Sequence, residues 1–372
     1  MEPFKNYFNQ DLIEKTADIF DRGPARFDRK HFVTLAAAEL EGLELKERAT
    51  QIMHALDQTL PAGFDEFEEA VLASLHKSED PSGEGLTFDG SGLMGFAAWP
   101  ITDLVTHRGL RAPERALPLL KEVTKRFTAE FAIRPFLVEH RDYTLSVLNG
   151  WVDDRSRHVR RLVSEGTRPR LPWGLRLSEF VADPAPILPF LKALRDDKED
   201  YVRRSVANSL NDIAKDHPDM VAEIAHDWLK DASINRTRLV RHACRTLLKA
   251  GHGKTLAAFG YEPVAGLTCD LSLLTPKVVF GEALEFEAII KAPVQKAPVM
   301  VDYAIHFVKA NGGTAPKVFK WKDAKLQGGH LCATRRHAIK PITTRRYYEG
   351  SHKLELFVNG VSVATADFEL CI

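Results

Sequence analysis

A segment that recurs in the middle of this 372-residue chain constrains its fold more than any other sequence feature. In each copy a turn containing aspartate leads into a valine followed by basic residues, and these valines are Val159, Val202 and Val240. The intervals between them are 43 and 38 residues. Periods of about 40–47 residues are typical of stacked helical pairs, in which each unit buries one face only against its neighbour. The spacing therefore predicts a helical solenoid with a concave surface.

Hydrophobic spacing assigns helices to most of the first 262 residues. Apolar residues recur at helical rather than alternating intervals in 11–75, and again from 113 to about 261. A stretch rich in glycine, serine and aspartate, 78–95, interrupts them. In the second repeat four residues form an apolar stripe suited to the core between helices: Val202, Val206, Leu210 and Ile213.

After residue 263 the pattern changes to an alternation with a period of two, which is typical of β-strands. Four segments show it: 271–275, 283–290, 301–308 and 352–358. Asn311-Gly312-Gly313 and Asn359-Gly360 are hairpin-turn signals. About 110 residues of short strands fit an immunoglobulin-like β-sandwich. We therefore expect a mostly α chain, with a HEAT-like repeat domain at 1–262 and a small all-β sandwich at 263–372.

The formal net charge of zero conceals an uneven distribution along the chain. The balance of basic over acidic residues is −10 for 1–110, +6 for 111–262 and +4 for 263–372. A polyanionic partner is therefore expected to meet the middle and the end of the chain. No apolar run reaches the ~18 residues of a membrane span, and the first residues do not resemble a secretory signal. Four widely spaced cysteines without C-x-x-C fit a reducing compartment, so we expect a cytoplasmic protein with no membrane partner.

Conventional enzyme motifs are absent from the sequence. Gly90-Ser91-Gly92-Leu93-Met94-Gly95 matches G-x-G-x-x-G literally, but a dinucleotide site needs a strand before this motif and a helix after it. The sequence contains no P-loop, no zinc motif of a protease or deaminase, and no G-x-S-x-G elbow. We therefore expect no nucleotide cofactor and no metal, and interpret the glycine-rich segment as a connecting loop.

The segment 164–174 is the most unusual part of the chain, because two prolines and two glycines stop a helix and hold a loop in one shape. Its polar and cationic side chains, Thr167, Arg168 and Arg170, suit contacts with phosphate. Trp173 stands between a proline and a glycine. It either presents its indole face to a ligand or fills a gap between successive repeats.

The polar stripes and two carboxylates can each be interpreted as structural or as functional. The second and third repeats carry stripes at helical spacing: Arg204, Asn208, Asp212 and Lys215, and Arg238, Arg241, Arg245 and Lys249. One such stripe usually marks a solvated face, whereas stripes repeated in stacked units line a groove. Glu130 either pairs with Arg126 and Arg134, four residues away on each side, or serves a site. Asp212 is either a surface residue of its helix or a functional one.

Three segments, taken together, resemble one protein family: 128–136, 164–173 and 202–213. They read Thr-Ala-Glu-Phe-Ala-Ile-Arg-Pro-Phe, Ser-Glu-Gly-Thr-Arg-Pro-Arg-Leu-Pro-Trp and Val-Arg-Arg-Ser-Val-Ala-Asn-Ser-Leu-Asn-Asp-Ile. They are similar to segments of the AlkC-type alkylpurine DNA glycosylases, relatives of AlkD in the HEAT-like repeat superfamily. The similarity extends over essentially 1–262, and the β-rich end looks like the immunoglobulin-like domain of some members.

The resemblance implies base excision repair of alkylated double-stranded DNA. Such an enzyme excises cationic N3-alkylated bases, chiefly 3-methyladenine with 3-methylcytosine as a second substrate, without turning the lesion into a deep pocket. By the family pattern the catalytic residues are Asp212, Glu130 and Trp173. Asp212 would act on water and the oxocarbenium-like sugar, Trp173 on the sugar and lesion face, and Glu130 as electrostatic support. The expected DNA contacts are Arg160, Arg168, Arg170, Arg204, Asn208 and Arg241.

The remaining expectations concern partners and the β-domain. The resemblance implies a monomeric, monofunctional hydrolase that works at the nucleoid without a cofactor. The basic β-domain would either close over bound DNA or cap the last repeat. The alternative from another class is a non-catalytic HEAT-repeat scaffold that binds DNA or protein through the same basic groove.

Overall fold

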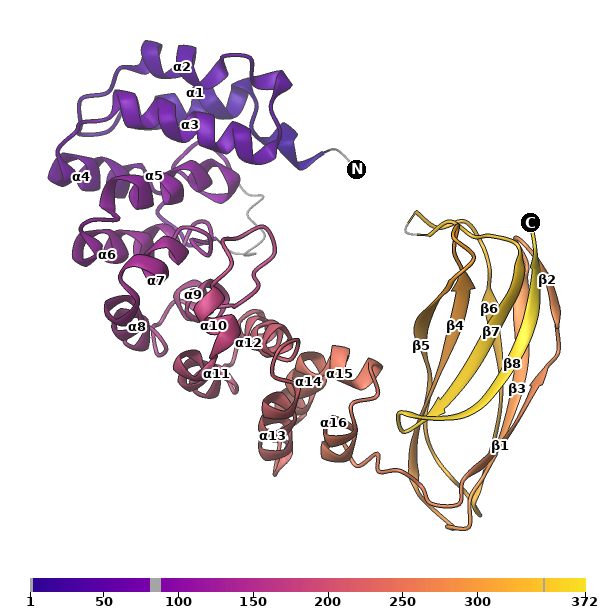
Figure 1. Ribbon diagram of the computed structural model, residues 1–372. Helices are drawn as coiled ribbons and strands as arrows, with labels where there is room; N and C mark the ends of the chain where they lie inside the picture. The colour runs from indigo at the N-terminus through magenta and orange to yellow at the C-terminus, as the bar shows by residue number, and fades with distance from the viewer. Residues whose placement is uncertain (1–2, 81–87, 344) are drawn as a thin grey trace. The chain divides into compact units, whose positions relative to one another are not determined.

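The structure is a computed structural model that describes residues 3–80, 88–343 and 345–372. The chain forms two compact units, Met1–Ile213 and Ala214–Ile372 (Figure 1). The glycine-rich segment 78–95 includes residues 81–87, which lie outside the described residues. Within the described part of the chain, no helix has both the length and the apolar character that a membrane crossing requires.

The first unit is built of helices that pack in successive layers (Figure 1). In chain order they are η1 (Phe4–Tyr7), α1 (Gln10–Asp21), α2 (Arg29–Ala37), η2 (Leu40–Gly42), α3 (Leu45–Thr59), α4 (Phe64–Ser74), η3 (Gly95–Ala98), α5 (Trp99–Gly109), α6 (Pro113–Val123), α7 (Arg134–Glu139), α8 (Arg141–Asn149), α9 (Arg157–Gly166), α10 (Ser178–Ala182), η4 (Ala185–Ile187), α11 (Leu188–Leu194) and α12 (Asp200–Ile213). Helix α5 packs against α3 and α6, and α9 packs against α11 and α12. The unit therefore has the layered helical-repeat architecture that the sequence spacing predicts.

The repeats that contain α9 and α12 begin with the same turn. Asp154 and Asp197 each accept a hydrogen bond at Oδ1 from the amide two residues later, at 2.8 and 2.9 Å. The arginine six residues after each aspartate donates back to the carbonyl of that aspartate, Arg160 at 2.8 Å and Arg203 at 2.6 Å. Because the same bonds hold both turns, residues at equivalent positions of the two turns are fixed in the same way.

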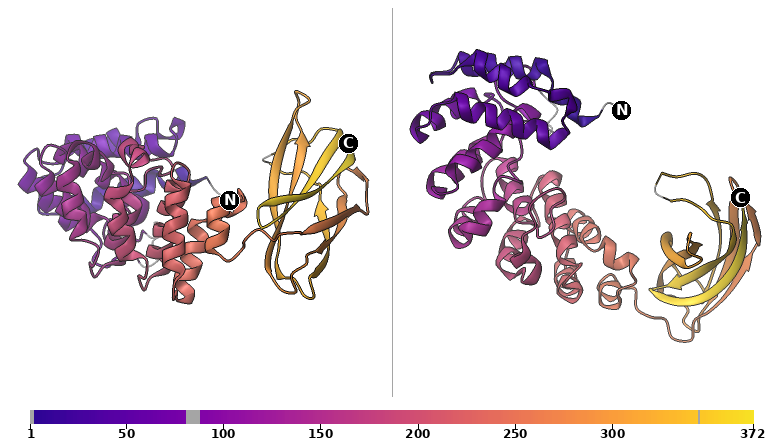
Figure 2. Two further views of the ribbon diagram at one scale, coloured as in Figure 1. Left: turned by 60° about the horizontal axis from the view of Figure 1, so that its bottom comes forward. Right: turned by 45° about the horizontal axis from the view of Figure 1, so that its top comes forward.

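In its described residues the second unit combines four helices with eight strands. The helices are α13 (Pro218–Leu229), α14 (Ile234–Ala243), α15 (Arg245–Lys249) and α16 (Gly253–Ala258), and the strands are β1 (Thr268–Leu273), β2 (Lys277–Val279), β3 (Ala283–Lys291), β4 (Pro298–Val308), β5 (Thr314–Lys325), β6 (His330–Ala338), β7 (Gly350–Val358) and β8 (Val361–Cys371). One sheet has the strand order β1-β3-β6 and the other β2-β8-β7-β4-β5. Figure 2 shows the strands of this unit from two further sides. Side chains of both sheets meet in one apolar core, where the rings of Phe286 and Tyr303 are 5.2 Å apart.

The apolar stripe predicted for α12 and both predicted hairpin turns are confirmed. The predicted apolar stripe of α12 is buried throughout, with exposed fractions of 2% or less. Asn311-Gly312-Gly313 joins the antiparallel strands β4 and β5. Asn359 and Gly360 join β7 and β8 with φ angles of 48° and 77°, as a primed hairpin turn requires.

Several elements were not predicted from the sequence. Helix α5 and strands β2, β5, β6 and β8 were missing from the expectation. Strands β5 and β6 are half-buried to exposed along their whole length, so no run of apolar residues marks them. The chain changes from helix to strand between Ala258 and Thr268, close to residue 262. The division into domains 1–262 and 263–372 stays a prediction.

Candidate active site

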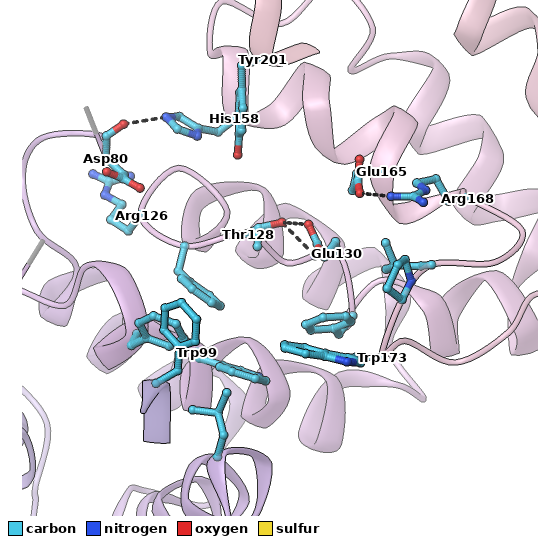
Figure 3. A pocket seen from close by; sticks show the side chains of 17 residues that line it. Asp80, Trp99, Arg126, Thr128, Glu130, His158, Glu165, Arg168, Trp173 and Tyr201 are labelled. Atoms are coloured by element: carbon cyan, nitrogen blue, oxygen red, sulfur yellow. Dashed lines mark hydrogen bonds and ion pairs between the residues drawn. The ribbon is translucent and has the colours of Figure 1, made fainter. Parts of the chain in front are cut away.

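The first unit contains a pocket of about 430 Å³ whose walls are mainly aromatic (Figure 3). Seven aromatic side chains line it: Phe4, Phe96, Trp99, Phe127, Phe131, Trp173 and Tyr201. Trp99 is the centre of one wall, because its ring lies 5.8 Å from that of Phe127 and 5.9 Å from that of Phe131. Charged side chains complete the lining, among them Glu130, Glu165 and Arg168. The pocket therefore suits a flat, cationic ligand.

Trp173 stands at the mouth of this pocket in a strained conformation. Its φ angle is +63°, in the left-handed region that costs a residue with a Cβ roughly 1–2 kcal/mol. The side chain is 72% exposed, so the indole does not fill a gap between repeats. Lys46 of α3 donates to the carbonyl oxygen of Trp173 at 2.5 Å and holds the loop from the other side. An exposed aromatic ring held at such a backbone cost indicates a functional position.

Glu130 lies in a turn before α7 and not on a helix. The interpretation that it pairs with Arg126 and Arg134 along a helix is therefore wrong. Its Oε2 accepts hydrogen bonds from Thr128 Oγ1 at 2.8 Å and from Arg161 Nη1 at 2.7 Å. The carboxylate is 12% exposed, so its remaining access is to the pocket that it lines.

An alternating series of buried and half-buried charges runs from Glu130 to Asp212. Arg161 lies 2.7 Å from Glu130 and 3.6 Å from Glu165. Arg168 donates to Glu165 from Nη1 at 2.6 Å and to Asp212 from Nε at 2.8 Å. Each side chain of the series is 16% exposed or less. We call these five residues the charge series: Glu130, Arg161, Glu165, Arg168 and Asp212.

The charge series keeps its central carboxyl group ionised although the group is buried. Burial raises the pKa of Glu165, but Arg161 and Arg168 more than offset this, so the net pKa is lowered. Arg134, which is fully buried beside the series, has its pKa lowered to about 10 by burial and by the charge of Arg168. Among the described residues, no group of three or more His, Cys, Asp or Glu side chains forms a site for a metal ion.

The structure brings together the three residues expected to be catalytic. Glu130 and Trp173 line the pocket, and Asp212 is bonded to the lining residue Arg168. Asp212 is 3% exposed and belongs to the interior of its helical layer, so it is not a surface residue of α12.

The six residues expected to contact DNA differ in their exposure and in their ion pairs. Arg168 and Arg160 are buried and already paired, Arg160 with both oxygens of Asp197 at 2.6 and 3.0 Å. Arg204 is exposed, whereas Arg170 and Asn208 are half-buried. Arg241 belongs to the second unit, where it pairs with Asp323 of β5 at 2.7 Å.

Sequence reasoning missed Arg161, Glu165 and the aromatic wall. Arg161 is adjacent to Arg160 in the repeated Val-Arg-Arg segment, and Glu165 belongs to the proline-rich segment already singled out. Their distance of four residues on one helix is a signal for an ion pair. Phe4 and Trp99 gave no such signal, because their place in the pocket depends on how distant helices pack.

Fold and site define a helical-repeat protein with a charged aromatic pocket and an all-β C-terminal domain. Two family models match the chain. "DNA alkylation repair enzyme" matches residues 103–249, and "Uncharacterised protein YhaZ, C-terminal Ig-like domain" matches residues 268–372.

Individual relatives cover the whole chain. It is 35% identical to the uncharacterized protein YhaZ of Bacillus subtilis (strain 168), over 100% of both sequences. Its structure is similar to that of the alkylpurine DNA glycosylase AlkC of Pseudomonas fluorescens, bound to DNA containing an abasic-site analogue. The TM-score is 0.86, with 32% identity and 100% of both chains covered. The chain belongs to the DNA alkylation repair enzyme family, with an AlkC-like fold and a C-terminal immunoglobulin-like domain.

Proposed function

We propose that this protein is a monofunctional DNA glycosylase that hydrolyses the N-glycosidic bond of cationic N3-alkylated bases in duplex DNA. 3-Methyladenine is the main substrate and 3-methylcytosine a second one. The observation that carries the proposal is one pocket lined by both the exposed Trp173 and the half-buried, arginine-paired Glu130. The relative AlkC, whose structure holds DNA with an abasic-site analogue, supports DNA as the partner.

The chemistry needs negative charge more than it needs an acid. An N3-alkylated adenine is already cationic, so its departure requires little proton donation. Departure leaves an oxocarbenium-like sugar, as in glycoside hydrolysis. Glu130 lines the pocket and supplies a negative charge near that sugar. We assign Asp212, which Arg168 links to the pocket, to the attacking water and the same developing charge.

Trp173 binds the cationic nucleotide through its ring face. Attraction between a cation and an indole amounts to roughly 0.5–2 kcal/mol. Because the ring is mostly exposed, it meets a lesion that remains near the surface of the duplex, without a deep pocket for a flipped base. Bending of the duplex would bring the lesion to the ring.

The reaction stops at hydrolysis and needs no cofactor. A lyase step requires an amine to form a Schiff base with the abasic sugar. Within the described residues no lysine lines the pocket, and the nearby Lys46 is bonded to the carbonyl of Trp173. Water is the second substrate. An enzyme of this kind works as a monomer on chromosomal DNA, in the cytoplasm at the nucleoid.

The finer architecture is also a proposal. We assign the helices to HEAT-like repeats and expect 1–262 to form the glycosylase domain. Arg204 is exposed on α12 and is the leading phosphate contact among the six residues expected from the sequence. Arg170 and Asn208, which are half-buried, are second candidates. Arg160 and Arg168 are buried in ion pairs and are the weakest candidates.

The alternative is a non-catalytic repeat scaffold that binds DNA or protein through its basic surface. A scaffold needs exposed cations but has no use for three carboxylates buried next to an aromatic pocket, so the charge series favours the enzyme. The test is release of 3-methyladenine from methylated duplex DNA, followed by chromatography, for the parent protein and Glu130→Gln. We expect release by the parent and a loss of about a hundredfold in the variant, with DNA binding retained. If the parent binds DNA but releases no base, the scaffold alternative is right.

A further inference from the structure

A second, smaller cavity of about 270 Å³ adjoins the aromatic pocket. Asp80 and His158 line both cavities, so the two cavities share a wall within the first unit. Figure 3 shows these two residues at the end of the pocket away from Trp173. His158 Nε2 lies 2.9 Å from the carbonyl oxygen of Asp80, which fixes the shared wall. The smaller cavity therefore lies at the end of the aromatic pocket away from Trp173.

The smaller cavity lies at the start of two helices that belong to successive repeats. Arg157, the first residue of α9, and Lys198 and Glu199, just before α12, line it together with Arg155. The amino ends of helices carry partial positive charge and unbonded amides, which favour an anion. This effect is modest, and the side chains at the cavity decide the argument.

Arg155 and Lys198 are equivalent residues of the two repeats. They are 43 residues apart, the same interval as between Val159 and Val202. Each is the residue after the turn aspartate, and its carbonyl accepts from the turn arginine, Arg155 from Arg160 at 3.1 Å and Lys198 from Arg203 at 2.9 Å. The repeated turn thus presents a cation at the same point in both layers.

Both cations are available to a ligand. Arg155 and Lys198 are exposed, and within the described residues neither side chain has an ion pair. Three acidic residues also line the cavity: Glu79, Asp80 and the half-buried Glu199. Glu79 accepts a hydrogen bond from Ser156 Oγ at 2.8 Å, and Asp80 is 3% exposed. Arg160, expected from the sequence to contact DNA, instead pairs with Asp197 and holds the turn.

We infer that this cavity is a phosphodiester subsite, in which Arg155 and Lys198 bind the DNA backbone next to the nucleotide whose base is removed. The inference rests on the proposed function, because the ligand is a phosphate of the same DNA strand that enters the aromatic pocket. The contact is to the backbone and carries no sequence preference. It positions the sugar against Glu130 from the end of the pocket opposite Trp173.

The test compares Arg155→Ala/Lys198→Ala with a matched control, Lys30→Ala/Lys192→Ala. The control removes two charges from exposed lysines of α2 and α11 that do not line this cavity. Binding to a duplex with an abasic-site analogue is measured across a range of salt concentrations. The slope of log K against log salt should fall by roughly 1.8 in the double variant, since each lost contact accounts for about 0.9. It should not change in the control.

A neutral backbone probe separates this subsite from general electrostatics. Single methylphosphonate groups are placed at each phosphate around the abasic analogue. At one or two positions next to it the parent should lose about tenfold in affinity, and the double variant should lose nothing further there. Equal losses in parent and variant at every position overturn the inference. Binding of inorganic phosphate alone with equal affinity would also overturn it, because the subsite would then not require a strand.

The outcomes distinguish this inference from the proposed function. If the parent releases 3-methyladenine while the double variant keeps the parent's salt slope, the enzyme stands and the subsite is wrong. If the parent neither binds nor cuts methylated DNA, the proposed function fails first. Thermal melting of the double variant is expected to match the parent, because both side chains are exposed.

Discussion

Arg168 donates from Nε to Oδ2 of Asp212 at 2.8 Å, and the two side chains are only 9% and 5% exposed. The other edge of the same guanidinium group is 2.6 Å from Glu165. A buried ion pair contributes little net stability over an apolar core, but removal of one partner leaves an uncompensated charge. Glu165 therefore determines where Arg168 lies, and Arg168 determines where Asp212 lies.

Asp212→Asn should abolish excision without abolishing DNA binding. The amide oxygen still accepts from Arg168, but the negative charge that stabilises the oxocarbenium-like sugar is gone. We expect the single-turnover release of 3-methyladenine to fall by about a hundredfold or more. Affinity for the abasic analogue should be equal or slightly higher, because one charge that repels phosphate is removed.

Asp200→Asn provides the matched control for this variant. Asp200 is an exposed carboxylate at the other end of α12, at 71% exposure. Its replacement should leave the rate of base release unchanged. Activity of Asp212→Asn equal to that of the parent would show that Asp212 has no catalytic role.

Glu165→Gln should lower the stability of the protein at neutral pH. It should also make the unfolding free energy change less as the pH is lowered. The pKa of Glu165 is lowered in the folded protein, because Arg161 and Arg168 outweigh the effect of burial. Its stabilising contribution is thus present above the ordinary value of 4.5 and disappears as the pH falls through the lower folded value. At pH 7 the variant should lose about 3–5 kcal/mol of unfolding free energy.

Denaturant unfolding between pH 3 and pH 7 measures this effect. The parent should lose more stability than the variant over the acid part of the range. Parallel curves for the two proteins would contradict the assignment of an ionised Glu165. Glu179→Gln, at an exposed carboxylate of α10, should behave like the parent.

Trp173→Gly should lower the rate of base release without lowering the stability of the protein. Glycine adopts a φ of +63° without the steric cost that tryptophan pays, and little buried surface is lost because the indole is exposed. The melting temperature should be equal to or above that of the parent, while base release falls by roughly 2- to 30-fold, the equivalent of the cation–indole attraction. Trp173→Phe keeps a ring and the strain, so its activity should lie between the two. A large drop in melting temperature for the glycine variant would mean that the ring is structural.

Asp103→Asn should stabilise the protein at neutral pH and not in acid. Burial raises the pKa of Asp103 to about 6, against an opposing hydrogen bond from Trp99 and the charge of Lys46. A raised folded pKa means that the folded state holds the proton more tightly, so stability decreases as the pH rises from about 4 to 6. The melting temperature of the variant relative to the parent should therefore be higher at pH 7.5 than at pH 4. The opposite trend would show that Asp103 is needed in its charged form.

The predictable parts of this fold are those with a local cause. Val202 and Val206 could be placed in the core because their spacing matches a helix turn, and Asn359-Gly360 could be placed in a hairpin because both residues tolerate a positive φ. The interpretation that Glu130 pairs with its neighbours along a helix failed for an equally local reason. Pro135 belongs to the first turn of α7 and marks the start of that helix, so the residues before it form a turn and not a continuous helix.

The partners in the site could not be predicted in this way. Glu130 meets Arg161, which is 31 residues away, and Arg168 meets Asp212, 44 residues away. Such pairs depend on which helices stack against each other and at what rotation. Arg160 shows the same limit of sequence-based prediction. The sequence of a repeat does not reveal whether a basic residue contacts DNA or stabilises a turn.

The hydrogen bond from Lys46 to the Trp173 carbonyl joins residues that are 127 positions apart. The pocket that it borders takes side chains from Phe4 to Tyr201, and therefore from nearly the full length of the first unit. Contacts this distant in sequence carry the entropic cost of closing a long loop. During synthesis the first helices leave the ribosome long before the tryptophan loop exists. The nascent chain can therefore form its first helices early, whereas the pocket cannot close until the residues up to Tyr201 have been synthesised.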